Sequence, residues 1–435
     1  MYTLNRRDLL RMAGLAGAAA SLSACGRGFG GGGDEDEAGK VTINMVWWGD
    51  AARAERTRKA LDLFEKQNPG LKVTTEYQDS GPYKDKLATR FAAGDAPDLL
   101  AMRTDSLQEY VSRGALLDLA GAADIDLTGV GDAARRLGAV GAKNFGVPVG
   151  LNSSGFVINK ALADKYKVAI PDGDSWSWQD LAAFARDINR ASGGKVYGTH
   201  FDPATLASLM IFTRQRGEDF FTEAGKVGFT EATIAAWFTM VEAMRAEGGF
   251  PKAGVIDPNA GSAGGEMYLG RGVIASQIIP TNNFLGYNKL VDGTLVLHRM
   301  PGEKQGTRPG QSVDTPALWS VAAGSKHPAE ARKLLNFLIN DVEAARATGT
   351  TRGVPASKTV ADQIKDTLEP DDQTATDYLT ELQGEKLAPS YLYPAGASTL
   401  PGTLKSIATE IEFKRLTPAA GAKKFTEAAT KALGA

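Results

Sequence analysis

The sequence is poor in several features on which large classes of protein depend. Its 435 residues include one cysteine, Cys25, and three histidines, so a disulfide framework and a thiolate metal cluster are excluded and a histidine-rich metal site is not expected. The 49 basic residues are balanced by 51 acidic ones, so there is no positive field of the kind that binds nucleic acid. No cofactor is implied. Hydrophobic residues make up 43% and charged residues 23%, a composition typical of a soluble globular protein of two or three domains.

The N-terminal residues show the order of features found in an export signal. A charged segment with paired arginines, residues 5–11, precedes an apolar run, residues 12–20, that is shorter than the about 20 residues needed to span a bilayer. The run leads into a lipobox, residues 22–25, where signal peptidase II would cleave before Cys25 and lipidate it. The paired arginines resemble a twin-arginine signal, with general export as the alternative route. The alternative interpretation of the whole segment is a buried N-terminal helix with a stray cysteine.

The residues that follow Cys25 are too rich in glycine and acidic residues to form a core. Residues 26–37 are therefore expected to be a flexible tether. We expect residues 1–24 to be a signal peptide and residues 25–39 to be a lipidated cysteine with its tether. This predicts an exported protein that is held at the outer face of the cytoplasmic membrane by a lipid anchor.

The rest of the chain alternates strand and helix patterns. Residues 41–48 are β-branched, aromatic and uncharged, which is typical of a buried strand, and Asp50 can cap a helix that runs to about Gln67. A second strand over 73–77, a helix opened by Pro82 and a third apolar run complete a βαβαβ order, which indicates a parallel sheet with helices on both faces. Further strands are predicted at 155–159, 273–279 and 319–323. The pattern favours an α/β protein with two lobes over one with a single large sheet.

Six short segments, taken in order, resemble a known family. They are WWGD (47–50), KLAT through GDAPDL (86–99), GALLDL (114–119), GVPVG through VINK (146–160), SKHPAEA (325–331) and RGVPAS (352–357). Together with the lipobox they resemble the family 1 extracellular solute-binding proteins of ABC importers, the group that contains the maltose/maltodextrin-binding proteins. The resemblance covers residues 40–435.

The resemblance implies a two-lobe periplasmic-binding-protein fold of type II, in which the ligand lies in a cleft between lobes joined by three hinge crossings. It places the crossings near 150–153, 300–306 and 348–353. The N-lobe would comprise 40–150 plus 306–348, and the C-lobe 153–300 plus 353–435. Such a protein, expected to be a monomer, closes around its ligand by hinge bending and delivers it to the transmembrane subunits of an ABC permease.

The expected ligand is a mono- or oligosaccharide, and sugar chemistry selects the candidate residues. A sugar ring has an apolar face that stacks on an aromatic ring, and hydroxyls that pair with carboxylate, amide or guanidinium groups. Several candidates have an alternative structural role: Asp50 as a helix cap, Asp105 as a loop charge, Trp319 as a core residue and Arg352 as an interlobe salt bridge. Of the late tyrosines, either Tyr391 or Tyr393 can supply a stacking ring. The resemblance implies ligand contacts from Trp48, Asp50, Asp79, Tyr83, Asp105, Asn152, Ser153, Phe201, Asn282, Asn283, Trp319, Arg352 and Tyr391.

The motifs of common hydrolases are missing from the sequence. There is no H-E-x-x-H, and the segment around Asn152 and Ser153 lacks the G-x-S-x-G spacing of a nucleophile elbow. A glycosidase needs only two facing carboxylates, so a secreted carbohydrate-active enzyme remains an alternative. A second alternative keeps the fold and changes the ligand to a polyol, a phosphosugar or another polar solute. The favoured interpretation is a binding protein without enzymatic activity.

Overall fold

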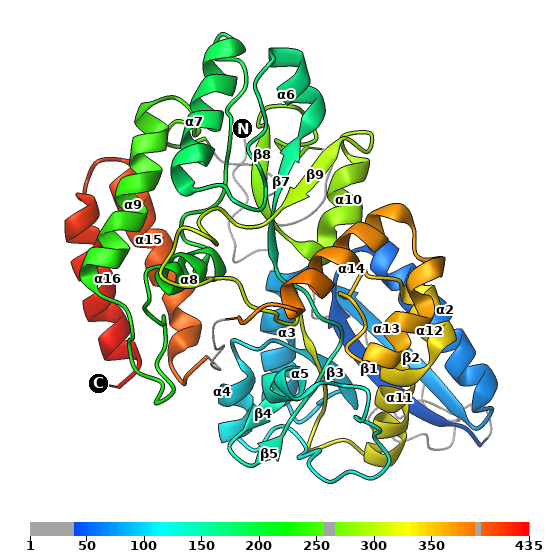
Figure 1. Cartoon of the computed structure of the whole chain (residues 1–435). Helices are drawn as coiled ribbons and strands as arrows, with labels where there is room; N and C mark the ends of the chain where they lie inside the picture. Colours follow the sequence, from blue (N-terminus) through cyan, green and yellow to red (C-terminus); the bar gives the residue numbers. More distant parts are fainter. Residues whose placement is uncertain (1–38, 256–265, 388–392, 435) are drawn as a thin grey trace, which may run out of the picture. The chain divides into compact units, whose positions relative to one another are not determined.

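The computed structural model describes residues 39–255, 266–387 and 393–434 (Figure 1). The predicted signal peptide and Cys25 lie outside these residues, as does Tyr391. Within them, no helix has the length and apolar character that crossing a membrane requires. The body that starts at residue 40 contains two main sheets and the helices that cover them.

The first sheet has five strands in the order β2-β1-β3-β10-β6. Strands β1 and β2 are parallel, as are β1 and β3, whereas β10 is antiparallel to β3 and β6. Side chains of β1 are buried on both faces of the sheet, Ile43 and Trp47 on one and Val46 on the other, because helices cover both. The predicted βαβαβ order is confirmed. The strands are β1 (Val41–Trp48), β2 (Leu71–Gln78), β3 (Leu99–Met102), β6 (Val147–Pro148) and β10 (Leu318–Val321).

Two groups of helices cover the first sheet. The residues beside Trp47 pack against α2, α11, α12 and α14, whereas Val46 packs against α3 and α4. Asp50 caps α2 as expected, since its Oδ1 accepts a hydrogen bond from the Arg53 backbone N–H at 2.7 Å. The helices are α2 (Ala51–Gln67), α3 (Ser80–Ala92), α4 (Leu107–Ser112), α11 (Pro328–Asn340), α12 (Val342–Thr348), α13 (Lys358–Ile364) and α14 (Pro370–Gln383).

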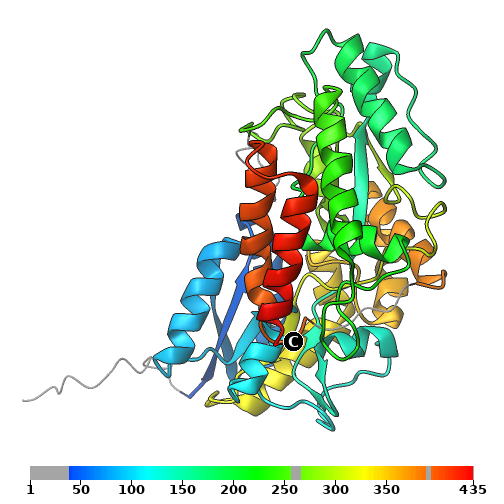
Figure 2. The ribbon, with the colours of Figure 1, turned by 90° about the vertical axis from the view of Figure 1, so that its left-hand side faces the viewer.

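The second sheet has three antiparallel strands in the order β8-β7-β9, with helices on both faces. On one face a core centred on Trp237 lies under α7, α8, α9, α15 and α16, of which the last two pack beside α9 (Figure 2). On the other face Val157 packs against α10. The elements are β7 (Ser154–Asn159), β8 (Ser276–Pro280), β9 (Leu295–His298), α6 (Lys160–Tyr166), α7 (Trp178–Ala191), α8 (Leu206–Gln215), α9 (Glu231–Ala246), α10 (Phe284–Lys289), α15 (Leu400–Glu412) and α16 (Pro418–Ala432).

Short elements connect these layers. A two-stranded ribbon pairs β4 with β5, and single 3₁₀ turns precede or follow several helices. They are α5 (Asp132–Arg135), η1 (Arg136–Gly138), β4 (Ala139–Val140), β5 (Lys143–Asn144), η2 (Thr281–Asn283), η3 (Lys365–Thr367) and η4 (Ala397–Thr399).

Three chain segments lie side by side where the chain passes from one sheet to the other. The backbones of Leu151 and Val354 exchange two hydrogen bonds of 2.6 and 2.8 Å, and those of Asn152 and Asp314 exchange two of 2.9 and 2.8 Å. Gly353 has a φ of +94°, and a Cβ on it would lie 2.4 Å from the carbonyl oxygen of Leu151, so only glycine allows this approach.

This pairing favours a second crossing near residues 312–315 and not at 300–306. Residues 300–306 belong with the second sheet, since the Gly302 N–H donates to Trp176 O at 2.9 Å and Gln215 Nε2 donates to Pro301 O at 2.8 Å. Helix α13 packs on α12, and Leu379 of α14 belongs to the core of the first sheet, although the expected boundary at 353 assigned these helices to the second lobe. The exact division into lobes stays a prediction.

Candidate functional site

The carboxyl end of β1 presents one of its two tryptophans to the surroundings. Trp47 is 1% exposed and stacks on Tyr77, with ring centroids 6.0 Å apart, whereas the next residue, Trp48, is only half-buried. The two side chains point to opposite faces because a strand alternates its side chains. Trp48 is therefore the ring at this end of β1 that can offer a face to a ligand.

Two neighbours fix the Trp48 ring. Tyr83 of α3 packs against it with ring centroids 5.4 Å apart, and Arg103 Cζ lies 5.8 Å from its centroid. Tyr83 itself is 5% exposed and its hydroxyl donates to Ala101 O at 2.8 Å. Tyr83 is one of the predicted ligand contacts, but in the structure its buried ring packs against Trp48.

Asp105 follows β3 and is held by a cation from its own loop. Arg103 Nη2 donates to Asp105 Oδ2 at 2.7 Å and Arg103 Nε to Oδ1 at 3.0 Å, while Ser106 Oγ donates to Oδ1 at 2.8 Å. Burial acts to raise the pKa of Asp105, but the hydrogen bond and the charge of Arg103 outweigh it, so the pKa lies below its usual value. The carboxylate is therefore ionised at neutral pH, and both of its oxygens already accept hydrogen bonds from Arg103 or Ser106.

The predicted polar residues at the first crossing form a chain of amides. Asn152 Nδ2 donates to Asn282 Oδ1 at 2.8 Å, and Asn282 Nδ2 donates to Asn283 Oδ1 at 3.1 Å. Within the described part of the chain, Asn152 Oδ1 and Asn283 Nδ2 have no hydrogen-bond partner, so one acceptor and one donor remain for a ligand. Ser153 is occupied, since its Oγ donates to Ser312 O at 2.8 Å.

Tyr393 lies near the second crossing and packs on the core of the second sheet. Its ring is half-buried, meets Phe221 edge-on at 5.5 Å, and its hydroxyl lies 3.5 Å from Met210 Sδ. Burial raises the pKa of Tyr393, and the negative charges of Asp314 and Asp105 add to this. The ring therefore lies within electrostatic reach of the loop after β3 and of the second crossing.

The sequence prediction missed two charged residues at the second crossing, the half-buried Asp314 and the buried Arg214. Burial raises the pKa of Asp314, against the Thr315 N–H that donates to its Oδ1 at 2.7 Å and the charge of Arg214. Arg214 of α8 is 4% exposed and donates to Ser312 Oγ at 3.0 Å. No local motif marks either residue, because Arg214 ends an apolar helix and Asp314 lies in a segment of irregular structure.

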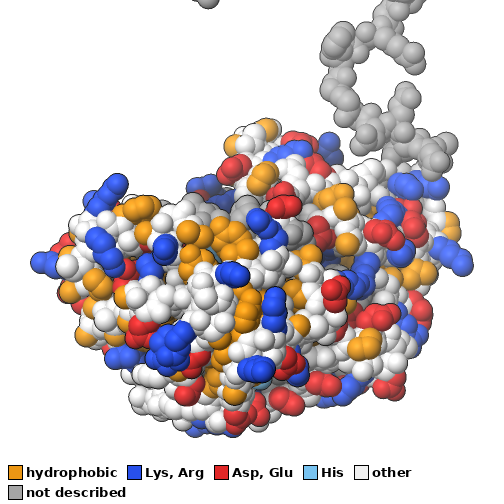
Figure 3. All heavy atoms as spheres, turned by 90° about the horizontal axis from the view of Figure 1, so that it is seen from above, with side chains coloured by type: hydrophobic (Ala, Val, Ile, Leu, Met, Phe, Trp, Pro, Cys, Tyr) orange, Lys and Arg blue, Asp and Glu red, His pale blue; other side chains and the backbone are white. Residues whose placement is uncertain are grey.

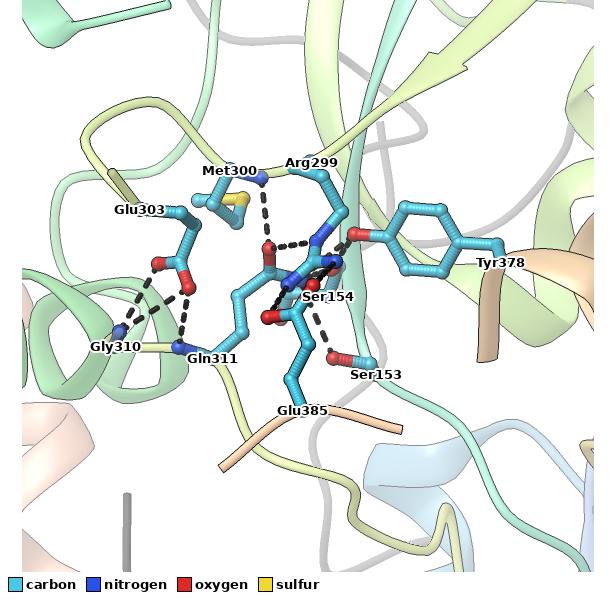
Figure 4. Close-up of polar contacts among 9 residues, drawn as sticks. All are labelled: Ser153, Ser154, Arg299, Met300, Glu303, Gly310, Gln311, Tyr378 and Glu385. Atoms are coloured by element: carbon cyan, nitrogen blue, oxygen red, sulfur yellow. Dashed lines mark hydrogen bonds and ion pairs between the residues drawn. The ribbon is translucent and has the colours of Figure 1, made fainter. Parts of the chain in front are cut away.

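A polar network joins the second crossing to three other elements (Figure 4). The side chain of Gln311 accepts from Arg299 Nε at 3.1 Å and from the Met300 N–H at 3.0 Å, and it donates to Ser154 O at 2.6 Å and to Tyr378 Oη at 2.7 Å. Arg299 also forms a two-pronged ion pair with Glu385, at 2.7 and 3.0 Å. The network ties β7, the end of β9 and α14 to the segment that crosses between the sheets.

A second acid lies beside this network. Glu303 accepts from Gln215 Nε2 at 2.7 Å and from the backbone N–H groups of Gly310 and Gln311 at 3.1 and 3.2 Å. Burial raises the pKa of Glu303, although these donors oppose the shift. The hydrogen bonds of this carboxyl group fix the loop between β9 and the second crossing.

Of the remaining predicted ligand contacts, three are buried and one is exposed. Phe201 is packed between Trp237 and Phe250, and Trp319 is buried in the first core, so the structure favours a core role for both rings. Asp79 is exposed before α3 and makes no capping hydrogen bond. Arg352 is 8% exposed at the third crossing and forms no ion pair within the described residues.

The site has the chemistry of a binding surface. By their chemistry Trp48 and Tyr393 are stacking rings, Asp105 is an ionised acceptor, and Asn152 and Asn283 carry unpaired amide groups; their place in one ligand site stays a prediction. Within the described residues no cluster of His, Cys, Asp and Glu has the composition of a metal site. On the face drawn in Figure 3, acidic, basic and hydrophobic side chains are interspersed, so this face carries no field of one sign.

Comparisons with known proteins bear on the fold and the family. A model of the bacterial extracellular solute-binding protein family matches residues 45–345. A periplasmic oligogalacturonide-binding protein from Yersinia enterocolitica, solved with saturated digalacturonic acid, is 23% identical with a TM-score of 0.80 over 91% of this chain and 99% of that one. An ABC substrate-binding protein from Listeria monocytogenes, solved with cycloalternan, is 21% identical with a TM-score of 0.76 over 91% and 99%.

A third similar structure extends the range of organisms. A receptor from Streptomyces glaucescens, solved unliganded and with acarbose, is 15% identical with a TM-score of 0.75 over 91% of this chain and 99% of that one. At these identities the likeness establishes the fold. The predicted class, an α/β protein with the two-lobe periplasmic-binding-protein fold, is confirmed.

Proposed function

Because the chain belongs to the bacterial extracellular solute-binding proteins, an exported family that serves ABC-type transport, we propose that it is the receptor for a carbohydrate. The family is one of binding proteins and not of enzymes. Three of the similar structures were solved with saccharides or a saccharide analogue, namely digalacturonic acid, cycloalternan and acarbose. These ligands support a sugar as the solute here.

The observation that carries the proposal is the combination of one fixed aromatic ring with unpaired polar groups. Trp48 is half-buried and held by Tyr83, so its orientation costs little entropy when a sugar ring stacks on it. Asp105 supplies an ionised acceptor, and hydrogen bonds to a charged group contribute about 1.5–3 kcal/mol each. The free amide groups of Asn152, at the first crossing, and of Asn283, after β8, would add hydrogen bonds to the ligand. Such groups reject a sugar whose hydroxyls leave them unpaired.

We propose that the ligand acts by favouring a closed form. Groups on the two sides of the crossings can meet one ligand only when the lobes approach each other, so the ligand selects closure by its differential contacts. Small-angle scattering should show a smaller radius of gyration on addition of the cognate sugar. An unchanged radius at saturating ligand would contradict hinge closure.

A thermal-shift screen against mono- and oligosaccharides tests the ligand class. A ligand at 100 times its Kd stabilises the folded protein by about 2.7 kcal/mol, which gives a clear increase in Tm. Trp48→Ala should weaken binding at least about tenfold, whereas Phe413→Ala, which removes an exposed ring elsewhere, should not change it. If only non-sugar polar solutes raise the Tm, the carbohydrate proposal is wrong. Release of products from an oligosaccharide by the purified protein would instead support the enzyme alternative.

We also propose that the mature protein is a lipid-anchored monomer that delivers its ligand to an ABC permease. The support for the anchor is the lipobox at residues 22–25. In a bacterial host the full chain should partition with membranes and enter the detergent phase, whereas Cys25→Ala should remain in the aqueous phase. Equal partitioning of the two proteins would exclude the anchor.

A further inference from the structure

Arg53 lies at the carboxyl end of β1 with its guanidinium only partly satisfied. Its side chain folds over Gly49, where an added Cβ would come within 2.6 Å of Arg53 Cδ. Arg53 Nη1 donates to Trp48 O at 3.2 Å. Its Nε is buried and has no acceptor within the described residues. The side chain is therefore held in place beside Trp48, but a donor is left without a partner.

Arg352 reaches the same end of β1 from the third crossing. Its Cζ lies 5.3 Å from the ring centroid of Trp47 and 4.9 Å from that of Trp319. The one hydrogen bond of its guanidinium to the described chain goes from Nη2 to Thr57 Oγ1, at 2.9 Å. Burial lowers the pKa of Arg352, and the positive charge of Arg53 lowers it further. Thr57 Oγ1 in turn donates to the Arg53 carbonyl oxygen at 2.7 Å, so one threonine links the two arginines.

Neither arginine forms an ion pair with any of the residues 39–255, 266–387 and 393–434. Two other arginines near the crossings are neutralised by ion pairs, Arg103 by Asp105 and Arg299 by Glu385, whereas Arg214 faces the charge of Asp314 without an ion pair in the described residues. The exposed carboxylate of Asp50 caps α2, and its charge offsets part of the burial that lowers the pKa of Arg53. A charge removed from water without a partner is costly, and Arg352, only 8% exposed, is such a charge, so a counter-charge from elsewhere would stabilise it.

The unsatisfied groups at this place are all donors. Besides Arg53 Nε, the indole Nε1 of Trp47, whose ring lies under Arg352, is buried without an acceptor in the described chain. A guanidinium has five N–H donors and no acceptor, and its planar fork matches two oxygens of a carboxylate or related anion. A neutral hydroxyl would satisfy a donor but would leave the charge of Arg352 uncompensated.

Resting on the proposed function, we propose that the sugar bound by this protein is acidic and that Arg53 and Arg352 hold its anionic group. A uronic-acid carboxylate fits the guanidinium fork best. A sugar phosphate presents the same charge and enters the test as a separate arm. Because the Trp48 carbonyl accepts a hydrogen bond from Arg53, the Trp48 side chain lies beside this arginine. It would stack on the sugar ring that carries the acidic group.

The experiment compares ligands that differ only in charge. Calorimetry is carried out with oligomers of galacturonic, glucuronic and mannuronic acid, with their methyl esters, with neutral oligosaccharides and with hexose 6-phosphates. We expect one acidic ligand to bind at least about tenfold more tightly than its neutral counterpart. Arg352→Gln and Arg53→Gln should each reduce this ratio about tenfold, and Arg352→Lys should retain part of it. Arg58→Gln, which removes an arginine of the same helix that is already paired with Asp62 and Glu65, should leave the ratio unchanged.

The outcomes separate the two proposals. If a neutral sugar or a methyl ester binds as tightly as every acidic ligand, the acidic-sugar inference is wrong and the carbohydrate receptor stands. If the ratio is present but insensitive to both Arg53→Gln and Arg352→Gln, these residues do not hold the anion and the inference is overturned. If no saccharide of either kind binds, the proposed function itself fails. Because Arg53 is half-buried, its variant gives the answer even if Arg352→Gln does not fold.

Discussion

The side chain of Gln311 offers a sharp test of the polar network at the second crossing. The residue is 0% exposed, and its side chain forms five hydrogen bonds, the four described above and one to Ser153 Oγ at 3.4 Å (Figure 4). Replacement by leucine keeps the size of the side chain and removes all five hydrogen bonds. Three of the partners have substitutes, because Tyr378 Oη still donates to Ser154 O at 2.9 Å and Ser153 Oγ to Ser312 O at 2.8 Å. The Met300 N–H and Arg299 Nε have none and become buried donors without an acceptor.

Each orphaned buried donor costs about 1–3 kcal/mol, so the two in Gln311→Leu should lower the free energy of unfolding by about 2–6 kcal/mol. The matched control is Gln67→Leu at the end of α2. That glutamine is exposed and makes one hydrogen bond of 3.3 Å, to Asp341, so its loss should change stability by less than about 0.5 kcal/mol. Urea unfolding followed by tryptophan fluorescence measures both variants. A Gln311→Leu protein as stable as the Gln67→Leu protein would refute the assignment of these hydrogen bonds.

Three further substitutions test separate features. Gly353→Ala should destabilise the protein by about 2 kcal/mol or more, because Gly353 has a positive φ and an added Cβ would lie 2.4 Å from Leu151 O. Gly402→Ala, in open space on α15, should instead stabilise the protein by up to about 1 kcal/mol. The same urea titration measures both variants. Burial lowers the pKa of His298, so the folded protein favours its neutral form. The resulting stability is present above about pH 6.5 and is lost as the pH falls through the lowered pKa. His298→Phe should therefore flatten the pH dependence of Tm in that range. Asn283→Ala should reduce the ligand-induced decrease in radius of gyration, measured by scattering at saturating sugar.

The parts of the fold that local chemistry determines were predictable from the sequence. The residues from Val41 to Trp48 are apolar on both faces of a strand, and only a central strand covered by helices buries both. Asp50 is placed to cap the helix that follows. The alternation of Trp47 and Trp48 follows from strand geometry alone. These features depend on neighbours in sequence, so a single chain reveals them.

The parts that depend on tertiary packing were not predictable in the same way. Tyr83 lies in the first turn of α3 and Phe201 in the loop before α8, and only their neighbours in space decide that both rings are buried. The second crossing was expected near 300–306, but Trp176 and Gln215, distant in sequence, hold that segment on the second sheet. Asp314 escaped notice because its importance comes from the backbone pairing with Asn152.

The position of the unpaired arginines has a consequence for closure. Arg53 and Arg352 both contact β1 or α2, so a ligand held by them alone would bind open and closed forms equally and would shift nothing, however tight the complex. Moving a hinge from 1:99 to 99:1 requires about 5.5 kcal/mol of differential contact. That energy has to come from groups attached to the second sheet, and the free amide of Asn283 is one of these. The crossings themselves stay paired through backbone hydrogen bonds, so bending there need not break the cores. Charge would thus anchor the ligand to one lobe, while the amide contacts would drive the lobes together.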